Sequence, residues 1–293
     1  MSSTRNNQKR LQAEAPPVDN PPTPKEEEQQ TQGLSFSVPT EFVDLPSRGL
    51  YYPEGHPLCS VDTVEIRHMT AKEEDILASQ SLIRKGIVLD RMLQSILVDK
   101  EIKVKDLLVG DKNALTIAAR ITGYGSEYAT RVTCPACGSA QEFEFDLETH
   151  STVGAAFNRE ELNESIDEVE FTENNTFILT LPKSGHKVEL KMLTGEDETR
   201  LQKYQSNKTK KDDSSTLTDT LKSIIISVAG HKDRNSINGF VEVMPALDSR
   251  YLRNIYQKLV PNIDLTQEFS CNSCGHTQDL EVPVTTDFFW PRS

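Results

Sequence analysis

The hydrophobic and polar positions predict a short strand running into a helix at two places in the chain. The segment VEIRHMTAKEEDIL (64–77) aligns without gaps on VELKMLTGEDETRL (188–201). Alternating apolar positions before the threonine of each segment are typical of a strand. Each threonine is placed as an N-cap, and an acid three residues later completes or imitates a capping box; these pairs are Thr70–Glu73 and Thr194–Asp197.

Apolar residues at helical spacing predict a second helix in both regions. LQSILV (93–98) aligns with LKSIII (221–226). The apolar stripes that contain these segments are Leu89, Met92, Leu93, Ile96 and Leu97 in one region, and Leu217, Leu221, Ile224, Ile225 and Val228 in the other. A stripe of this kind is the apolar face of an amphipathic helix, which packs into the hydrophobic core of the protein.

A third helix and a hairpin follow in both regions. Asp111 and Asp248 each open a helix 23 residues before a cysteine. Strand periodicity then enters and leaves a cysteine-containing turn, which predicts a β-hairpin. The strands are expected at residues 128–133 and 141–147 in one region, and at 265–270 and 278–284 in the other.

These matches occur in the same order, and the offset between them grows from 124 to 128 and then to 137 residues. The increments can be absorbed in the polar stretches 206–216 and 231–239, both expected to be loops. LPSRG (45–49) and LPKSG (181–185) form a further, weaker match. We therefore expect an α+β fold, internally duplicated as strand–helix–helix–helix–β-hairpin units joined by a four-cysteine, zinc-ribbon-like site.

Composition divides the chain around these units. Residues 1–36 are rich in Gln, Glu, Pro, Asn and Thr, which predicts a disordered polar tail. The further segments that we expect are an aromatic, Pro/Gly-rich arm at 37–62, the first repeat at 63–150, an acidic linker at 151–172 and the second repeat at 173–293.

Four of the five cysteines stand in two CxxCG turns, CPACG (134–138) and CNSCG (271–275). Two such turns supply four thiolates, the complete tetrahedral set of a structural zinc site. The predicted ligands are Cys134, Cys137, Cys271 and Cys274. Each repeat would contribute one half-site, so that zinc would clasp the repeats together. Buried or disulfide-linked cysteines are the alternative.

The remaining chemistry argues against an enzyme. No P-loop, HExxH, G-x-S-x-G or dinucleotide fingerprint is present in the sequence. Four cysteines leave His276 as a non-ligating neighbour and leave no open position for catalytic zinc. The net charge of −13 and the acidic residues of both hairpins disfavour nucleic acid. No apolar run is long enough to span a membrane, and the paired CxxC turns indicate a reducing cytoplasm.

Aromatic residues mark two candidate surfaces for a partner protein. Tyr51 and Tyr52 stand in the loop at 42–55, and Phe288, Phe289 and Trp290 close the chain. Large aromatic side chains carry much of the energy of cores and interfaces alike. Packing of these residues within the chain's own core is therefore the alternative.

Several of these motifs together resemble the T4-type contractile-tail phage baseplate proteins, the family of the baseplate hub subunit and the hub assembly factor. The resemblance rests on LPSRGLYYPEG, MTAKEEDIL, GDKNAL, the paired CxxCG turns and FFW, and covers about residues 40 to 290. It implies a non-enzymatic protein that is part of the baseplate or assembles its hub. Its partners would be other baseplate and hub proteins, met in the host cytoplasm during assembly or in the virion tail.

Two other functions remain open at this point. A zinc-ribbon adaptor that engages nucleic-acid machinery is the first alternative, because zinc ribbons often bind nucleic acid. Metal-dependent hydrolysis is the second.

Overall fold

The N-terminal half begins with a two-stranded antiparallel sheet, β1 (Thr40–Asp44) and β2 (Thr63–Arg67), in which Phe42 lies opposite Glu65. The computed structural model describes residues 37–154, 169–206, 216–283 and 288–290. The expected disordered tail at 1–36 lies outside the described residues, as do most of the loop at 206–216 and much of the acidic linker. We call residues 38–154 the N-terminal half and residues 169–290 the C-terminal half.

Strand β2 runs into helix α1 (Ala71–Ala78), as the sequence predicts. The Glu73 carboxylate accepts hydrogen bonds from the Thr70 amide at 3.0 Å and the Thr70 hydroxyl at 2.7 Å. It also accepts a bidentate pair from Arg67 and one bond from the Ser95 hydroxyl. These bonds fix the angle between β2 and α1, because they hold the start of the helix to the end of the strand.

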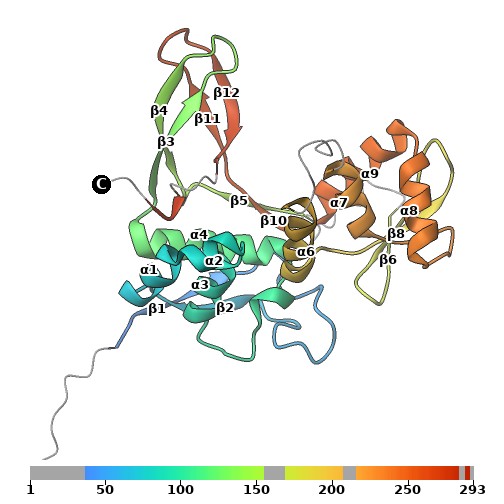
Figure 1. Ribbon diagram of the computed structural model, residues 1–293, viewed down its shortest axis with the longest axis horizontal. Coiled ribbons are helices and arrows are strands. Elements are labelled where there is room, and N and C mark those ends of the chain that lie inside the picture. The colour runs from blue at the N-terminus through green and yellow to red at the C-terminus, as the bar shows by residue number, and fades with distance from the viewer. Residues whose placement is uncertain (1–36, 155–168, 207–215, 284–287, 291–293) are drawn as a thin grey trace, which may run out of the picture. The chain divides into compact units, whose positions relative to one another are not determined.

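The rest of the N-terminal half is helical up to its hairpin. Its elements are α2 (Gln80–Arg84), α3 (Val88–Ile96), the 3-10 turn η1 (Val104–Asp106), α4 (Val109–Tyr124), and the strands β3 (Glu127–Thr133) and β4 (Ala140–Asp146) (Figure 1). Met92, Leu93, Ile96 and Leu97 are buried and Leu89 is half-buried, which confirms the core stripe predicted for this half.

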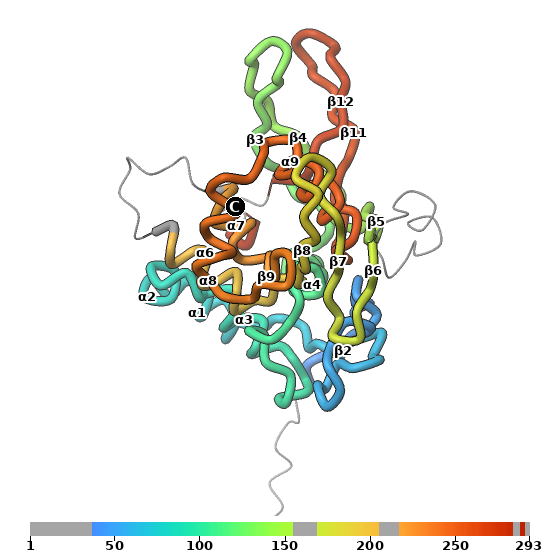
Figure 2. The backbone as a smooth tube through the Cα atoms, turned by 90° about the vertical axis from the view of Figure 1, so that its right-hand side faces the viewer, coloured from blue at the N-terminus to red at the C-terminus, as the bar shows by residue number. Residues whose placement is uncertain are grey.

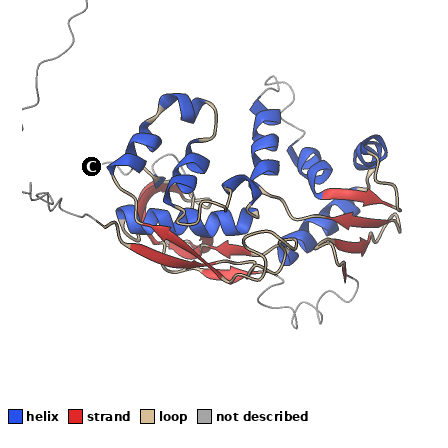
Figure 3. Cartoon of the chain, turned by 90° about the horizontal axis from the view of Figure 1, so that it is seen from below, coloured by secondary structure: helices blue, strands red, loops and turns tan. Residues whose placement is uncertain are grey.

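The C-terminal half contains a four-stranded antiparallel sheet in the order β6-β7-β8-β9. Its strands are β6 (Glu170–Phe171), β7 (Phe177–Thr180), β8 (Lys187–Leu190) and β9 (Ile225–Val228). The helices of this half are α6 (Gly195–Ser206), α7 (Thr216–Ile224), α8 (Arg234–Val243) and α9 (Ala246–Leu259). The chain ends in β10 (Asn262–Asp264) and the hairpin β11 (Thr266–Ser270) and β12 (Thr277–Glu281). Helices and short strands are interspersed in both halves (Figure 3), which makes the fold α+β.

Three local predictions in the C-terminal half are wrong. Leu217 was expected in the core, but it lies in the first turn of α7 and is 55% exposed. Ile225 and Val228 were expected on a helix, but they belong to β9, which pairs with β8. The β-branched residues of this stretch suit a strand once the edge of β8 is available. Residues 231–239 were expected to be a loop, yet α8 begins within them because the Asp233 side chain caps the amide of Ser236 at 2.8 Å.

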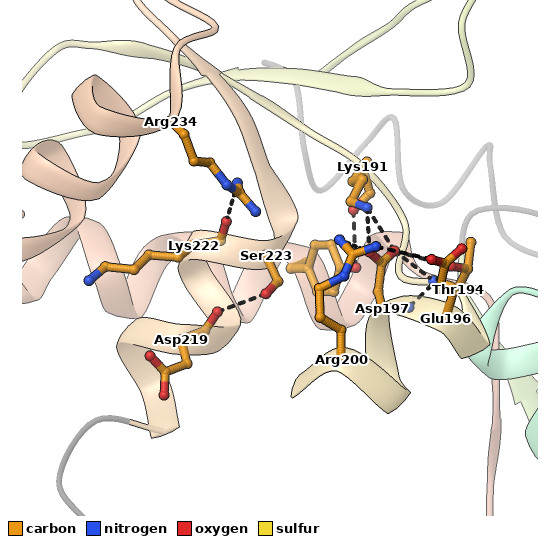
Figure 4. A network of polar contacts seen from close by, with 10 residues as sticks. Lys191, Thr194, Glu196, Asp197, Arg200, Asp219, Lys222, Ser223 and Arg234 are labelled. Carbon is orange, nitrogen blue, oxygen red and sulfur yellow. Dashed lines mark hydrogen bonds and ion pairs between the residues drawn. The ribbon is translucent and has the colours of Figure 1, made fainter. Parts of the chain in front are cut away.

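A polar network fixes the start of α6 (Figure 4). Asp197 accepts hydrogen bonds from the Thr194 amide and hydroxyl, both at 3.2 Å. Lys191, which directly follows β8, donates to both Asp197 oxygens, at 2.8 and 2.7 Å, and Arg200 lies 3.7 Å from Asp197. Lys191 thus holds the cap of α6 to β8, as Arg67 holds the cap of α1 to β2.

The two halves share one hydrophobic core and several backbone contacts. Strand β10 pairs with β5 (Ser151–Val153), and the amides of Val109 and Gly195 donate to the carbonyls of Leu193 and Leu107 across the junction. Lys112 on α4 completes the junction with ion pairs to Asp90 at 2.6 Å and Glu198 at 2.7 Å. No helix in the described residues is both long and apolar enough to cross a bilayer.

Candidate metal centre

Each cysteine turn has the same backbone geometry at the tip of its hairpin. The Cys134 amide donates to the carbonyl of Ser139 at 2.8 Å, and the Gly138 amide donates to the carbonyl of Cys134 at 2.9 Å. In the other turn, Cys271 pairs with His276 and Gly275 with Cys271, each at 2.9 Å.

The glycine of each turn has a positive φ, 73° at Gly138 and 70° at Gly275. Glycine is the residue that adopts this conformation without steric cost. The turn therefore needs glycine after its second cysteine to bring its backbone close to the thiols.

The hairpins β3–β4 and β11–β12 lie side by side in both views (Figures 1 and 2). Gln141 on β4 joins them, because its side-chain amide donates to the Ser270 carbonyl at 3.0 Å and its oxygen accepts the Asn272 amide at 2.8 Å. Nearer the base, the Phe143 and Phe269 rings meet at 5.2 Å between centroids. These contacts bring the cysteine turns together.

The four thiols converge on one point. Cys134 Sγ lies 3.8 Å from Cys274 Sγ, and Cys137 Sγ lies 3.7 Å from Cys271 Sγ. All four sulfur atoms lie within 4.8 Å of one another. A tetrahedral zinc ion with Zn–S bonds of about 2.3 Å requires sulfur atoms about 3.8 Å apart. The spacing therefore fits a four-thiolate metal ion.

Burial follows the same order in both turns. The first cysteine of each, Cys134 and Cys271, is buried, whereas Cys137 and Cys274 are exposed. All four are free thiols, and their sulfur separations are far longer than a disulfide bond of about 2.05 Å. The four cysteines are therefore not linked by disulfide bonds in the structure.

One hydroxyl acts on thiols from both hairpins. Ser139 Oγ lies 3.1 Å from Cys137 Sγ and 3.6 Å from Cys271 Sγ. Hydrogen bonds, that of Ser139 first among them, lower the pKa of Cys137 and lower the pKa of Cys271 to about 6. At Cys274 the backbone of His276 lowers the pKa, but the neighbouring thiols outweigh it and raise the pKa to about 12. A lowered pKa favours the thiolate, which is the form that binds metal.

His276 occupies the position in the second turn that Ser139 occupies in the first. Its Nε2 atom lies 3.2 Å from the side-chain oxygen of Gln278. Among the described residues, the four cysteines form a group close enough to hold one metal ion, and His276 does not belong to it.

The aromatic residues expected at partner surfaces are mostly in the core. Tyr52, Phe288 and Phe289 are 4%, 1% and 2% exposed. Tyr51 is half-buried, with its ring 6.1 Å from that of Phe177, and Trp290 is 37% exposed. Tyr51 and Trp290 thus retain surface that another protein could contact.

Sequence reasoning did not single out Arg120, which is 2% exposed. Its guanidinium donates to the carbonyls of Phe288 at 2.6 Å, Gly125 at 2.6 Å and Glu127 at 3.1 Å. It therefore ties the aromatic end of the chain to α4 and β3. An arginine within a long apolar helix face was the available signal, because a buried guanidinium needs several acceptors.

A cavity of about 440 Å³ lies where α3, α4 and α6 meet β10. Part of its polar lining is internally paired: Lys112 binds Asp90 and Glu198, and the Asn113 amide donates to Asn262. Groups bound in this way hold the halves together.

Comparison with known proteins identifies one family. The model of the T4 bacteriophage base plate protein family matches residues 40–290, which include both halves and all four cysteines of the cluster. No curated protein and no solved structure matches the chain. The family model covers most of the chain, and the protein belongs to the T4 bacteriophage base plate protein family.

Proposed function

We propose that this protein is a non-enzymatic component or assembly factor of the baseplate hub that acts through protein–protein contacts. The observation that carries this proposal is the family match over residues 40–290. Its partners would be other baseplate and hub proteins. It would meet them in the host cytoplasm during assembly, and it would be found in the tail if it stays in the particle.

We further propose that the four cysteines hold a structural zinc ion. Their separations support tetrahedral coordination, and four thiolates fill the shell, so that the ion has no open position for a reacting water. Structural zinc contributes about 10–16 kcal/mol in zinc-finger peptides. Because two ligands come from each hairpin, the ion would clasp the tips of β3–β4 and β11–β12.

We also propose that the halves arose by internal duplication. The cap of α1 and the cap of α6 support it, because each uses a threonine, an acid three residues later and a basic residue three residues before the threonine. The matching sets are Arg67, Thr70 and Glu73, and Lys191, Thr194 and Asp197. An acid that binds both its cap and the preceding strand is a specific arrangement to find twice.

The LPxxG turns give independent support. Asp111 at the start of α4 accepts the amide of Ser47 at 2.9 Å and its hydroxyl at 2.6 Å. Asp248 at the start of α9 accepts the amides of Lys183 at 2.7 Å and Ser184 at 2.9 Å. In both halves, therefore, the aspartate that opens the long helix anchors the turn of a hairpin.

Strand pairing extends the correspondence. An isolated bridge joins Ile66 on β2 to Leu97 after α3, and the matching residue of β8, Leu190, pairs with Ile225 after α7. The hairpin β1–β2 thus corresponds to β7–β8. We propose that the duplicated unit starts at this hairpin, so that much of the arm at 37–62 belongs to the first repeat.

The acidic surface of the hairpins argues against the nucleic-acid adaptor. The exposed acids on their strands are Glu127, Glu142, Glu144, Asp146, Glu268, Asp279 and Glu281. The exposed basic residue there, Arg131, lies opposite Glu142. Phosphate would be repelled from this surface.

Three measurements on the purified chain and on purified phage test the proposal. We expect about one zinc ion per chain that a chelator removes only slowly, no DNA binding at low salt, and peptides of this protein in tail particles or in hub assembly intermediates. DNA affinity at low salt would favour the adaptor. Hydrolytic activity that depends on exchangeable metal would contradict a non-enzymatic role.

A further inference from the structure

Backbone groups along the outer edge of β1 have no strand partner among the described residues. The Pro39 carbonyl accepts the His68 amide, and the Leu45 amide donates to the Asp62 carbonyl, so the backbone groups at these two positions, which flank β1, face the segment that contains β2. In an antiparallel ladder every second residue bonds to a given neighbour. The amides and carbonyls of the intervening residues, which are Thr40, Phe42 and Asp44, therefore face away from β2.

In the part of the chain that the structure describes, no strand pairs with this outer edge. Phe42 at its centre is 70% exposed, which is unusual for a phenylalanine within a strand. An edge strand that combines free backbone groups with an exposed aromatic residue is a template for pairing with another strand.

The C-terminal half shows the corresponding edge covered. Ile178 on β7 lies opposite Glu189 on β8, as Phe42 lies opposite Glu65 on β2. Strand β6 pairs with the outer edge of β7, with Glu170 opposite Ile178. The position of Phe42 is therefore one at which a second antiparallel strand is accommodated.

A second contact marks the same edge. Thr176 on the N-terminal side of β7 occupies the place of Thr40, and its carbonyl accepts the Thr172 amide at 2.9 Å. Two of the three matching outward-facing positions, Thr176 and Ile178, are thus paired with the covering segment. The N-terminal sheet has β1 and β2 and lacks a described counterpart of β6.

We propose that the outer edge of β1 binds an extended strand of a partner protein in the antiparallel position that β6 occupies on β7. This inference rests on the proposed duplication and on the proposed role through protein contacts. Main-chain hydrogen bonds would supply the affinity, and the alternating side chains would supply the specificity, as in other cases of strand addition.

The charges around Phe42 define the partner's chemistry. Asp44 on β1 and Glu65 on β2 share the exposed face with Phe42, and Arg67 on that face is engaged by Glu73. An acidic edge favours a strand with an apolar residue opposite Phe42 and lysine or arginine two positions away. A second copy of this chain is disfavoured, because each copy carries a net charge of −13.

The test uses the full chain and a short fluorescent peptide with the core Lys-Val-Phe-Val-Lys. We expect the peptide to bind, and its counterpart with Glu in place of both Lys to bind at least about tenfold more weakly. N-methylation of the peptide's Phe amide, which faces β1, should abolish binding. N-methylation of the preceding Val amide, which faces away, should leave binding intact. Equal effects of the two methylations would overturn strand pairing.

Two substitutions of Phe42 distinguish the contribution of its backbone amide to binding from that of its side chain. Phe42→Pro removes the outward amide without removing a bond to β2, and an edge strand tolerates proline. We expect it to weaken peptide binding by about tenfold or more, whereas Phe42→Thr, which keeps the amide, should retain part of the affinity. Unchanged circular dichroism would show that both variants fold. Undiminished binding by Phe42→Pro would overturn the proposal.

A photo-crosslinking residue in place of Phe42 identifies the occupant. Crosslinks to the peptide support a partner strand. Crosslinks to residues 1–36 of the same chain, or to a second copy, would overturn the proposal, because they would identify another occupant of this edge. The zinc content and the presence of the protein in phage particles are measured separately, so that failure of this inference is distinguishable from failure of the proposed function.

Discussion

The Sγ atom of Cys134 lies 3.8 Å from the Sγ atom of Cys274, although the two residues belong to different hairpins in different halves of the chain. A metal bound there would join the hairpin tips, while the halves are joined elsewhere, through their shared core, Lys112 and the pairing of β5 with β10. The two junctions can therefore be perturbed independently.

Replacing Cys134 and Cys137 together by serine should abolish zinc binding, because two ligands of the tetrahedral set are lost. We expect new protease cleavage within β3–β4 and β11–β12 and little change elsewhere, since the Lys112 junction remains. Metal analysis and mass spectrometry of the fragments measure both effects. Cys59→Ser is the matched control, because Cys59 lies outside the cluster. An unchanged digestion pattern would count against a metal clasp.

The free energy of unfolding should depend on pH through the ionisation of Glu73. Burial raises the pKa of Glu73, but hydrogen bonds from Arg67, Ser95 and Thr70 outweigh burial and hold it at about 2. A carboxylate whose folded pKa is depressed stabilises the fold above its unfolded pKa of about 4.3 and loses that contribution as the pH falls towards 2.

We therefore expect Glu73→Gln to lower the free energy of unfolding by about 3 kcal/mol at neutral pH. The difference from the unsubstituted chain should shrink steadily between about pH 4.3 and pH 2. Urea unfolding at a series of pH values measures it. Glu74→Gln, on the same helix but without this network, is the control, and a pH-independent difference would show that the charge of Glu73 is not the cause.

Local signals made much of this fold predictable. The threonine–acid pairs located the starts of α1 and α6, and the glycines that follow Cys137 and Cys274 indicated turns that gather thiols. Both signals lie within a few residues, so that they can be recognised without knowledge of tertiary contacts.

The features that could not be predicted depend on contacts between residues far apart in the sequence. Ile225 continues a helical stripe, yet it joins β9 because the edge of β8 is available beside it. Asp111 was read as a helix opener, and its role in holding the turn of Ser47 becomes visible only when residues 64 positions apart meet. Phe288 reads equally well as core or interface until Arg120 is placed beside it.

The junction between the halves should be sensitive to Lys112. Its ammonium group lies 2.6 Å from Asp90 and 2.7 Å from Glu198, and its side chain is 10% exposed. Burial lowers the pKa of Lys112, but its two carboxylate partners outweigh burial and raise it overall, so that the lysine stays charged.

Lys112→Met leaves two carboxylates facing each other without a cation. We expect a loss of about 2–4 kcal/mol in the free energy of unfolding, since removing one partner of a buried ion pair leaves an uncompensated charge. Lys222→Met is the control: Lys222 pairs with the exposed Glu242, and its loss should cost about 1 kcal/mol or less. Equal losses in the two variants would show that the Lys112 contacts do not hold the junction.

The aromatic end of the chain should depend on Arg120. Its guanidinium satisfies the carbonyls of Phe288, Gly125 and Glu127, and it lies 5.9 Å from the centre of the Phe288 ring. Arg120→Met removes the bonds to all three carbonyls but keeps an apolar side chain of similar length. We expect the segment at Phe288 to detach more easily, because buried acceptors left without donors are costly.

Trp290, the single tryptophan of the chain, reports on this segment directly. Since Trp290 is 37% exposed when the segment is anchored, its fluorescence in Arg120→Met should shift to longer wavelength and become more accessible to acrylamide quenching. Arg131→Met changes an exposed arginine on β3 and should leave the emission unchanged. If both variants quench alike, the end of the chain is held by the rings of Phe288 and Phe289 in the core and not by the guanidinium, because apolar burial alone would then be sufficient.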